Sequence, residues 1–152
     1  FLINVLTLFF CSTLVCAQTS YLGETIPCDQ VELGCVILGS AISGEHVIRN
    51  NAEYQELIQE RSPHPNCGFY ELPSIDFSEY TLIGYVSSIG GCKTPEISHE
   101  IKRINNDYRV NIDIIQYGRC KRGNPIKLWC LVPKIDENAT VEFAVDSTVR
   151  EN

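Results

Sequence analysis

The stretch YRVNIDIIQYGRC, residues 108–120, alternates apolar and polar side chains over its first seven positions. In a β-strand such an alternation places one set on each face, which is the pattern of a half-buried strand. The inward set is Tyr108, Val110, Ile112 and Ile114, and the outward set is Arg109, Asn111 and Asp113. A hairpin is expected to begin with DFSEYTLIGYVSSIGGC, residues 76–92, to turn at the polar residues 105–107 and to return through residues 108–120. The region from Asp76 to Pro133 is therefore expected to be organised around a β-hairpin and its flanks.

Further strands are predicted on both sides of this hairpin. Their expected ranges are 80–87, 97–104, 108–117, 126–132 and 140–146, with turns at 122–125 and 136–138. Short connections between them favour antiparallel neighbours. Earlier in the chain we expect a flexible lead-in over 18–27, a strand over 35–38 and an edge strand over 46–48. Trp129 lies in an apolar strand and is expected to be part of the core.

One amphipathic helix is predicted after residue 50. Asn50 can cap it, and Glu53 stands three residues later, as in a capping box. Tyr54, Leu57 and Ile58 form its apolar face, and Pro63 favours an end near Arg61. The expected fold class is α+β: a mostly antiparallel sheet, arranged as a sandwich or an open barrel, with this helix covering one face or end.

Residues 1–17, FLINVLTLFFCSTLVCA, carry no charge and predict a secretory signal peptide cleaved after Ala17. A membrane anchor is the alternative, although the run is short of the roughly 20 apolar residues that a spanning helix needs. Lipid attachment at Cys16 is not expected, because Val15 before it is not a small residue. The mature chain, 18–152, is then expected to be a single disulfide-bonded domain that is secreted or periplasmic.

The net charge of −7 lies entirely in the mature chain. Phosphate backbones repel an acidic domain, which argues against nucleic acid as a partner. Anionic membrane surfaces attract it poorly as well. Solubility is the simplest explanation of the acidity.

Removal of the signal segment leaves six of the eight cysteines, and an exported chain with six cysteines predicts disulfides. A hairpin centred on Asn106 pairs Cys92 with Cys120, because each lies fourteen residues from that centre. Cys28 is then expected to bond Cys35, and Cys67 to bond Cys130. The cysteine spacings and the scattered histidines do not predict a zinc site.

The residues that could act in catalysis are each better explained by a structural or surface role. His64 and Cys67 form a nucleophile pair only if the thiol is free, whereas Cys67 is expected to be oxidised. His99, Glu100, Lys102 and Arg103 are interpreted as the solvated face of a strand. Glu71, Asp76 and Glu79 are interpreted as surface carboxylates, and no cofactor-binding motif follows a strand. We therefore expect neither catalysis nor a bound cofactor.

Residues 61–74, RSPHPNCGFYELPS, form a proline-rich loop. An exposed, disulfide-anchored loop is how many protease inhibitors present a substrate-like bond. Here that bond would be Arg61-Ser62 or Phe69-Tyr70, with His64 beside it; a plain connecting loop is the alternative. Separately, Asn138-Ala139-Thr140 matches the N-glycosylation triplet in a predicted turn, which matters only in a eukaryotic source.

The segments DFSEYTLIG, GGC, YGRCKRG, Trp129 with VPK, and VEF together resemble a group of exported Bacteroidetes proteins, the PrcB-like domain of a protease-complex subunit. RNNAEYQELIQE, residues 49–60, resembles the helical opening of that group. The resemblance runs from Asp76 to Phe143 and covers about two-thirds of the mature chain. Its motifs are structural and transfer no catalytic residue. Cys28, Cys35, Cys67 and Cys130 look like additions to the two cysteines of the pattern.

What the resemblance implies is a small β-rich domain that assists or associates with a protease. We therefore expect an exported, non-enzymatic binding or accessory domain with a protein partner. The alternative is a protease inhibitor acting through residues 61–74.

Overall fold

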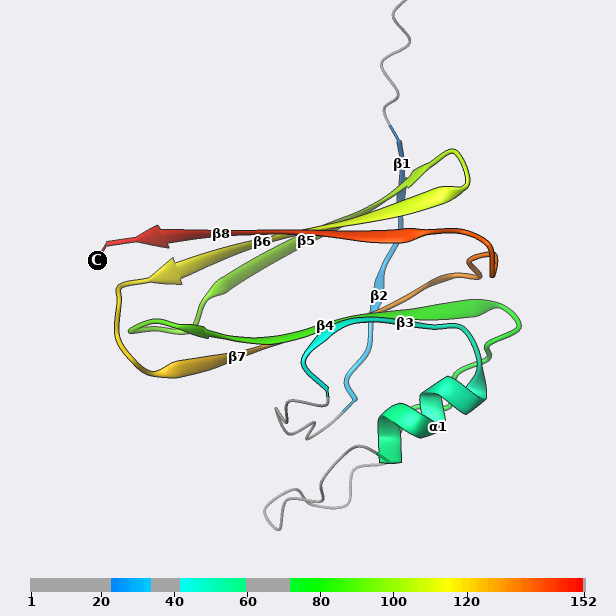
Figure 1. The fold of residues 1–152 in the computed structure, drawn as a ribbon, viewed down its shortest axis with the longest axis horizontal. Coiled ribbons are helices and arrows are strands. Elements are labelled where there is room, and N and C mark those ends of the chain that lie inside the picture. The colour runs from blue at the N-terminus through cyan, green and yellow to red at the C-terminus, as the bar shows by residue number, and fades with distance from the viewer. Residues whose placement is uncertain (1–22, 34–41, 60–71, 152) are drawn as a thin grey trace, which may run out of the picture.

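The computed structural model describes residues 23–33, 42–59 and 72–151. Two four-stranded sheets face each other, and a single described helix covers the outer side of one of them (Figure 1). The elements are β1 (Glu24–Ile26), β2 (Asp29–Gln30), β3 (Gly44–Ile48), α1 (Asn51–Gln59), β4 (Tyr80–Gly90), β5 (Glu96–Ile104), β6 (Asp107–Tyr117), β7 (Gly123–Pro133) and β8 (Val141–Arg150). The expected α+β class and mostly antiparallel strands are confirmed, and of the two expected arrangements, a sandwich or an open barrel, the structure has the sandwich.

The first sheet has the order β1-β5-β6-β8 and contains the predicted hairpin. Strands β5 and β6 pair antiparallel from Glu96↔Ile115 to Ile104↔Asp107 around a two-residue turn. Asn105 has φ 59° there, a conformation that asparagine tolerates better than most residues. Strand β8 then lies parallel to β6 along its whole length. The second sheet has the order β2-β7-β4-β3 and is antiparallel throughout.

The expectation that short connections join neighbouring strands holds for β5 and β6 and is wrong for β4 to β5, β6 to β7 and β7 to β8. Each of these connections crosses from one sheet to the other (Figure 1). The alternation of apolar and polar residues determines which face of a strand is buried. It does not determine to which of the two sheets the strand belongs. From β4 onward, every connection except the one between β5 and β6 therefore joins opposite layers of one core.

Three boundaries also differ from the predictions. The expected lead-in contains β1, which pairs with β5. The expected turn at 122–125 lies largely within β7, whose Gly123 pairs with Gly90. Strand β8 continues to Arg150, four residues beyond the expected end. The strand predicted over 35–38 lies outside the described residues.

The core between the sheets is formed by the inward faces of β4, β5, β6 and β7. Its fully buried members include Ile83, Ile101, Val110 and Val132. The alternation predicted for residues 108–114 is confirmed, with Arg109 and Asp113 exposed on the opposite face. Val141, Phe143 and Val145 of β8 pack against this core but stay only half-buried.

A second core lies between the other face of the second sheet and α1. It joins Tyr54 and Leu57 of the helix to Leu82, Val86 and Trp129 of the sheet. The predicted capping pair is present: Glu53 N donates to Asn50 Oδ1 at 3.0 Å, as in a capping box. The Glu53 carboxylate reaches back to the Asn50 side chain at 2.7 Å and to Arg49 N at 2.6 Å. The predicted helix end near Arg61 lies outside the described residues.

Trp129 occupies the centre of this second core, as predicted, and is 4% exposed. Its ring lies over Gly84, the residue opposite it on β4. A Cβ atom added at Gly84 would stand 2.0 Å from Trp129 Cζ3, so only glycine leaves room for the indole. His46 packs against the indole with ring centroids 5.3 Å apart.

Cys92 and Cys120 form the predicted disulfide, with Cα atoms 4.8 Å apart. The hairpin register expected to bring them together is wrong by one residue, because the turn is centred between Asn105 and Asn106. Both cysteines lie beyond the paired strands, in the connections that leave β4 and β6. Those connections cross between the sheets at the same end, where Gly91 N donates to Cys120 O at 3.1 Å. The bond therefore joins two crossovers rather than two hairpin strands.

The other predicted disulfides, Cys28–Cys35 and Cys67–Cys130, are wrong, because Cys28 bonds Cys130 instead. Residues 23–33, which we call the crossover segment, carry β1 at the edge of the first sheet and β2 at the edge of the second (Figure 1). Gln30 pairs with Cys130 on β7. This crossing places Cys28 beside Cys130, which is 102 positions away in the sequence. The prediction chose Cys35 because it is the nearest cysteine along the chain.

Candidate functional site

Strand β8 is the longest unprotected edge in the part of the chain that the structure describes. It has ten residues, and its described neighbour is β6 alone. Edge strands present backbone N–H and C=O groups that can pair with another chain. The sequence interpretation recognised the strand but not its position at an edge.

The direction of the free backbone groups follows from the parallel ladder. Tyr108 N donates to Thr140 O at 2.8 Å, and Gly118 N donates to Arg150 O at 2.9 Å. In a parallel pair, alternate residues of a strand turn both backbone groups toward the neighbour, and the residues between turn theirs away. The even-numbered residues of β8 therefore bond to β6. The backbone groups at 141, 143, 145, 147 and 149 point away from the sheet.

The side chains of β8 differ sharply between its two faces. The inward face carries half-buried Val141, Phe143 and Val145, and continues to Val149, which is 45% exposed. The outward face is polar and carries Glu142, Asp146 and Arg150. Asp146 lies directly beside Asp113 of β6, and both are exposed. Like charges at facing positions repel each other, so this surface favours a cation beside Asp146.

The other described edges are short or interrupted. Strands β1 and β2 have three and two residues, and β3 has five. Gly44 begins β3 with φ 123°, and the next residue is the exposed Glu45. Short edges are a common device against strand addition. Strand β8 is longer and contains neither proline nor glycine, although it carries the charged residues Glu142, Asp146 and Arg150.

A pocket of about 290 Å³ adjoins the start of β8. It is lined by Ile104, Asn105, Asp107, Tyr108, Arg109, Thr140 and Glu142. The Asp107 carboxylate accepts a hydrogen bond from Thr140 N at 2.9 Å and so fixes the entry into the strand. The pocket extends the edge surface toward the hairpin turn.

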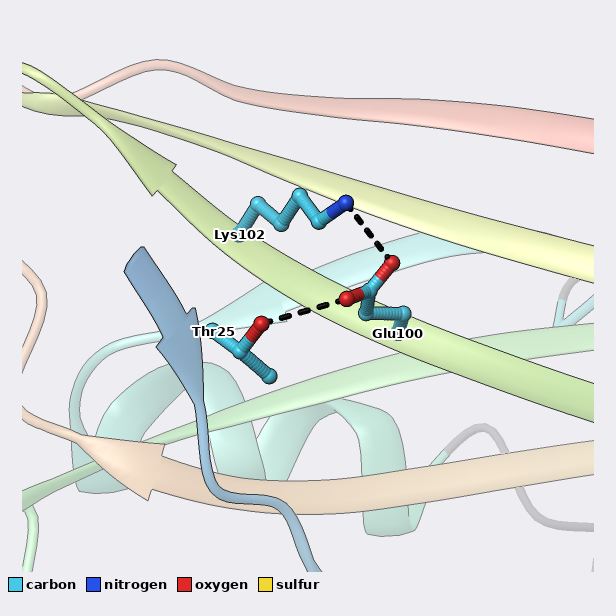
Figure 2. A network of polar contacts seen from close by, with 3 residues as sticks. All are labelled: Thr25, Glu100 and Lys102. Carbon is cyan, nitrogen blue, oxygen red and sulfur yellow. Dashed lines mark hydrogen bonds and ion pairs between the residues drawn. The ribbon is translucent and has the colours of Figure 1, made fainter. Parts of the chain in front are cut away.

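Glu100 joins β1 to β5 on the outer face of the first sheet (Figure 2). Thr25 Oγ1 donates to Glu100 Oε1 at 3.1 Å, and Lys102 Nζ lies 3.0 Å from Glu100 Oε2. The hydrogen bond from Lys102 lowers the pKa of the Glu100 carboxyl, with a smaller contribution in the same direction from Thr25. The contribution of these contacts to stability is therefore present above the unfolded-state pKa of glutamate and is lost as the pH falls through the lower folded-state pKa.

We expect Lys102→Met to raise the pKa of the Glu100 carboxyl toward its ordinary value, because the main group that favours its charged form is removed. Carbon-detected NMR titration of the carboxylates measures this pKa directly. Lys121→Met, which removes an exposed cation from the connection between β6 and β7, should leave it unchanged. An equal pKa in the wild type and in Lys102→Met would contradict the assignment.

His99 contacts a disulfide, which the sequence interpretation missed. The prediction that His99 lies on a solvated face is wrong, because the side chain is half-buried. It lies on the same side of β5 as the buried Ile101, two residues away. Its Nε2 atom lies 3.3 Å from Cys28 Sγ and 3.6 Å from Cys130 Sγ. The contact joins residues 71 and 31 positions apart, so no local motif reveals it.

The ligand atoms of Cys28, His99 and Cys130 lie within 4.8 Å of one another. Zinc binds thiolate sulfur at about 2.3 Å and imidazole nitrogen at about 2.0–2.1 Å, so ligand atoms this close to one another could surround a single ion. The two sulfurs are bonded to each other and therefore provide no thiolate in this state. The expectation that the protein binds no metal stays a prediction.

Most of the other candidate residues fall on parts of the chain that the structure does not describe. Arg61, Ser62, His64, Cys67, Phe69 and Tyr70 lie outside the described residues, as do Cys35 and Glu71. The end of that loop is held by Tyr54, whose hydroxyl donates to Pro73 O at 3.1 Å. Asn138 is exposed between β7 and β8, and its glycosylation stays a prediction.

Two further shifted pKa values belong to local structure. Asp76 accepts hydrogen bonds from the hydroxyl and backbone N–H of Ser78, which lower the pKa of its carboxyl. This contact stabilises the turn before β4, and Asp76 is exposed, in agreement with its interpretation as a surface carboxylate. Tyr117 donates to Glu96, which raises the pKa of the phenol.

Within the described residues, no helix combines the length and the apolar composition that a membrane span requires. The chain matches no family model, no curated protein and no solved structure. For the residues that the structure describes, the fold and the site therefore define a class by themselves: a disulfide-linked β-sandwich with one covering helix and a long edge strand whose outer side pairs with no described strand.

Proposed function

We propose that this chain is an exported protein-binding domain that pairs through β8 with an extended segment of a partner protein. The main observation behind this proposal is that β8, which is ten residues long, lies at the edge of its sheet among the described residues. Backbone hydrogen bonds to the free groups of an edge strand supply affinity, and alternate side chains supply specificity. The role is that of a binding module rather than an enzyme.

The side chains of β8 determine the chemistry of the partner segment. Apolar residues on one face of the added strand would cover Val145 and Val149, which are only partly buried now. On the other face, a lysine or arginine would lie beside Asp146 and Asp113. The net charge of −7 also favours a basic segment by electrostatic complementarity.

Two disulfides support an oxidising, extracytoplasmic location, because such bonds rarely persist in the cytosol. The PrcB-like resemblance of Asp76 to Phe143 favours a protease as the partner. On this proposal the domain delivers or holds a protease through the added strand and does not block its active site. Incubation with trypsin-like and chymotrypsin-like proteases separates this role from inhibition through residues 61–74, which would show slow cleavage and loss of protease activity.

We expect Ser147→Pro to abolish partner binding without unfolding the protein. Position 147 directs its N–H away from β6, and proline is tolerated at such positions of edge strands. The ring removes one outward donor and obstructs an added strand. Binding is measured with ten-residue segments, the length of β8, selected from a displayed random library by the folded wild-type protein.

Ser147→Ala is the matched control, because it changes the same exposed side chain and keeps the N–H; it should bind as the wild type does. Asp146→Lys should weaken the binding of the selected basic segments about tenfold or more, and a library selected on this variant should yield acidic segments instead. Segments that bind Ser147→Pro as tightly as the wild type would rule out pairing with β8.

A further inference from the structure

The contact between His99 and the Cys28–Cys130 disulfide joins three elements at one side of the sandwich. Cys28 comes from the crossover segment, Cys130 from β7 of the second sheet, and His99 from β5 of the first. The imidazole Nε2 lies within 3.6 Å of both sulfurs. The second disulfide, Cys92–Cys120, has no described histidine in contact with it, so the two bonds differ in chemistry.

The two sulfurs also differ in exposure. Cys130 is 0% exposed, whereas Cys28 is half-buried at the edge of the core. The more exposed sulfur, Cys28 Sγ, is the one that an attacking thiolate can reach. Because the thiolate approaches along the S–S axis, attack at Cys28 would expel Cys130 Sγ. A thiolate left at Cys130 would be buried, and burial disfavours a charged sulfur. A proton donor beside that sulfur removes this cost, and His99 is placed there.

We propose that Cys28–Cys130 is a thiol-exchange site that accepts small dithiols, with His99 as its catalytic acid. The thiolate of the dithiol attacks Cys28 Sγ and forms a mixed disulfide. The Cys28–Cys130 bond breaks, its electron pair moves to Cys130 Sγ, and that sulfur takes a proton from Nε2 of the His99 imidazolium, which is left as neutral imidazole. The second thiolate of the dithiol then attacks the mixed disulfide, expels the Cys28 thiolate and leaves as a cyclic disulfide. The protein gains two electrons, and the dithiol is the species oxidised.

Reduction at this site would release the crossover segment. Beyond the disulfide, that segment is paired through three residues of β1 and two of β2. Val31 N adds one bond to Trp129 O at 2.9 Å. The bond between Cys28 and Cys130 is therefore the strongest link between the sheets along this side, and exchange there changes how firmly the sandwich is closed.

The test is the rate of reduction of each disulfide in the intact folded protein. The protein is treated with dithiothreitol without denaturant, sampled over time, blocked with iodoacetamide and mapped by mass spectrometry. We expect His99→Gln to slow reduction of Cys28–Cys130 about tenfold or more, because the leaving sulfur loses its proton donor. Cys92–Cys120 in the same molecules is the internal control and should be reduced at an unchanged rate.

A measurement on the wild type keeps the proposal testable if His99→Gln does not fold. The protein is exposed to glutathione, a monothiol, quenched in acid and mapped for mixed disulfides. The adduct is expected on Cys28 and not on Cys130. An adduct on Cys130, an unchanged rate in folded His99→Gln, or an equal slowing of both disulfides would each overturn the proposal.

Discussion

Trp129→Ala is expected to lower the free energy of unfolding by about 3–5 kcal/mol, the range for removal of a large aromatic from a core. The indole is buried between the second sheet and α1. Gly84 leaves an open surface beneath the ring, so alanine at 129 would create a cavity bounded on one side by bare backbone. Urea unfolding followed by far-UV circular dichroism measures the change.

Tyr80→Ala is the matched control, because it removes another aromatic ring from the second sheet at a position that is 40% exposed. Its cost should be well below that of Trp129→Ala. Trp129→Phe should also cost less, because it retains a ring and removes a buried indole N–H that has no partner among the described residues. A Trp129→Ala protein as stable as the wild type would mean that the ring serves a partner rather than the core.

Removal of Cys28–Cys130 by the double change Cys28→Ser and Cys130→Ser is expected to cost about 4–5 kcal/mol. The chain-entropy model gives this value for a closed loop of about 100 residues, and the two cysteines are 102 positions apart. Cys92→Ser with Cys120→Ser opens a loop with a separation of 28 and should cost roughly 3–4 kcal/mol. The two double variants are compared by denaturant unfolding under non-reducing conditions.

The comparison between the two double variants is itself the control, because each replaces two half-cystines with serines. The larger effect is expected at Cys28–Cys130, where the loop is longer and Cys130 is completely buried. If the Cys92–Cys120 variant were the less stable one, the two crossovers that this bond joins would contribute more to stability than loop length predicts.

The sequence predicted those parts of the fold that depend on local chemistry. The capping pair of Asn50 and Glu53, the alternating faces of residues 108–114 and the burial of Trp129 are all present. Each depends on a spacing within a few residues. The pairing of strands was predicted less well, because alternation is satisfied equally by either of two facing sheets.

In the candidate sites, too, the features that depend on sheet order were not predicted from the sequence. Cys92–Cys120 was predicted although the turn is centred half a residue away from the assumed position, because the two crossovers meet at one end of the sandwich. The contact of His99 with Cys28 and Cys130, and the edge position of β8, depend on sheet order alone. Neither the spacing nor the polarity of those residues carries that information.

Each sheet is built from strands that are separated in the sequence by strands of the other sheet, so neither sheet comes from one continuous piece of chain. Strand β7, of the second sheet, lies between β6 and β8 in the sequence, and β1 pairs with a strand more than seventy positions later. Contacts of such sequence separation require long loops to close before they contribute to stability, and domains dominated by them fold in milliseconds to seconds. We therefore expect this sandwich to fold slowly and as one cooperative unit, with β8 and its free edge among the last elements to become ordered.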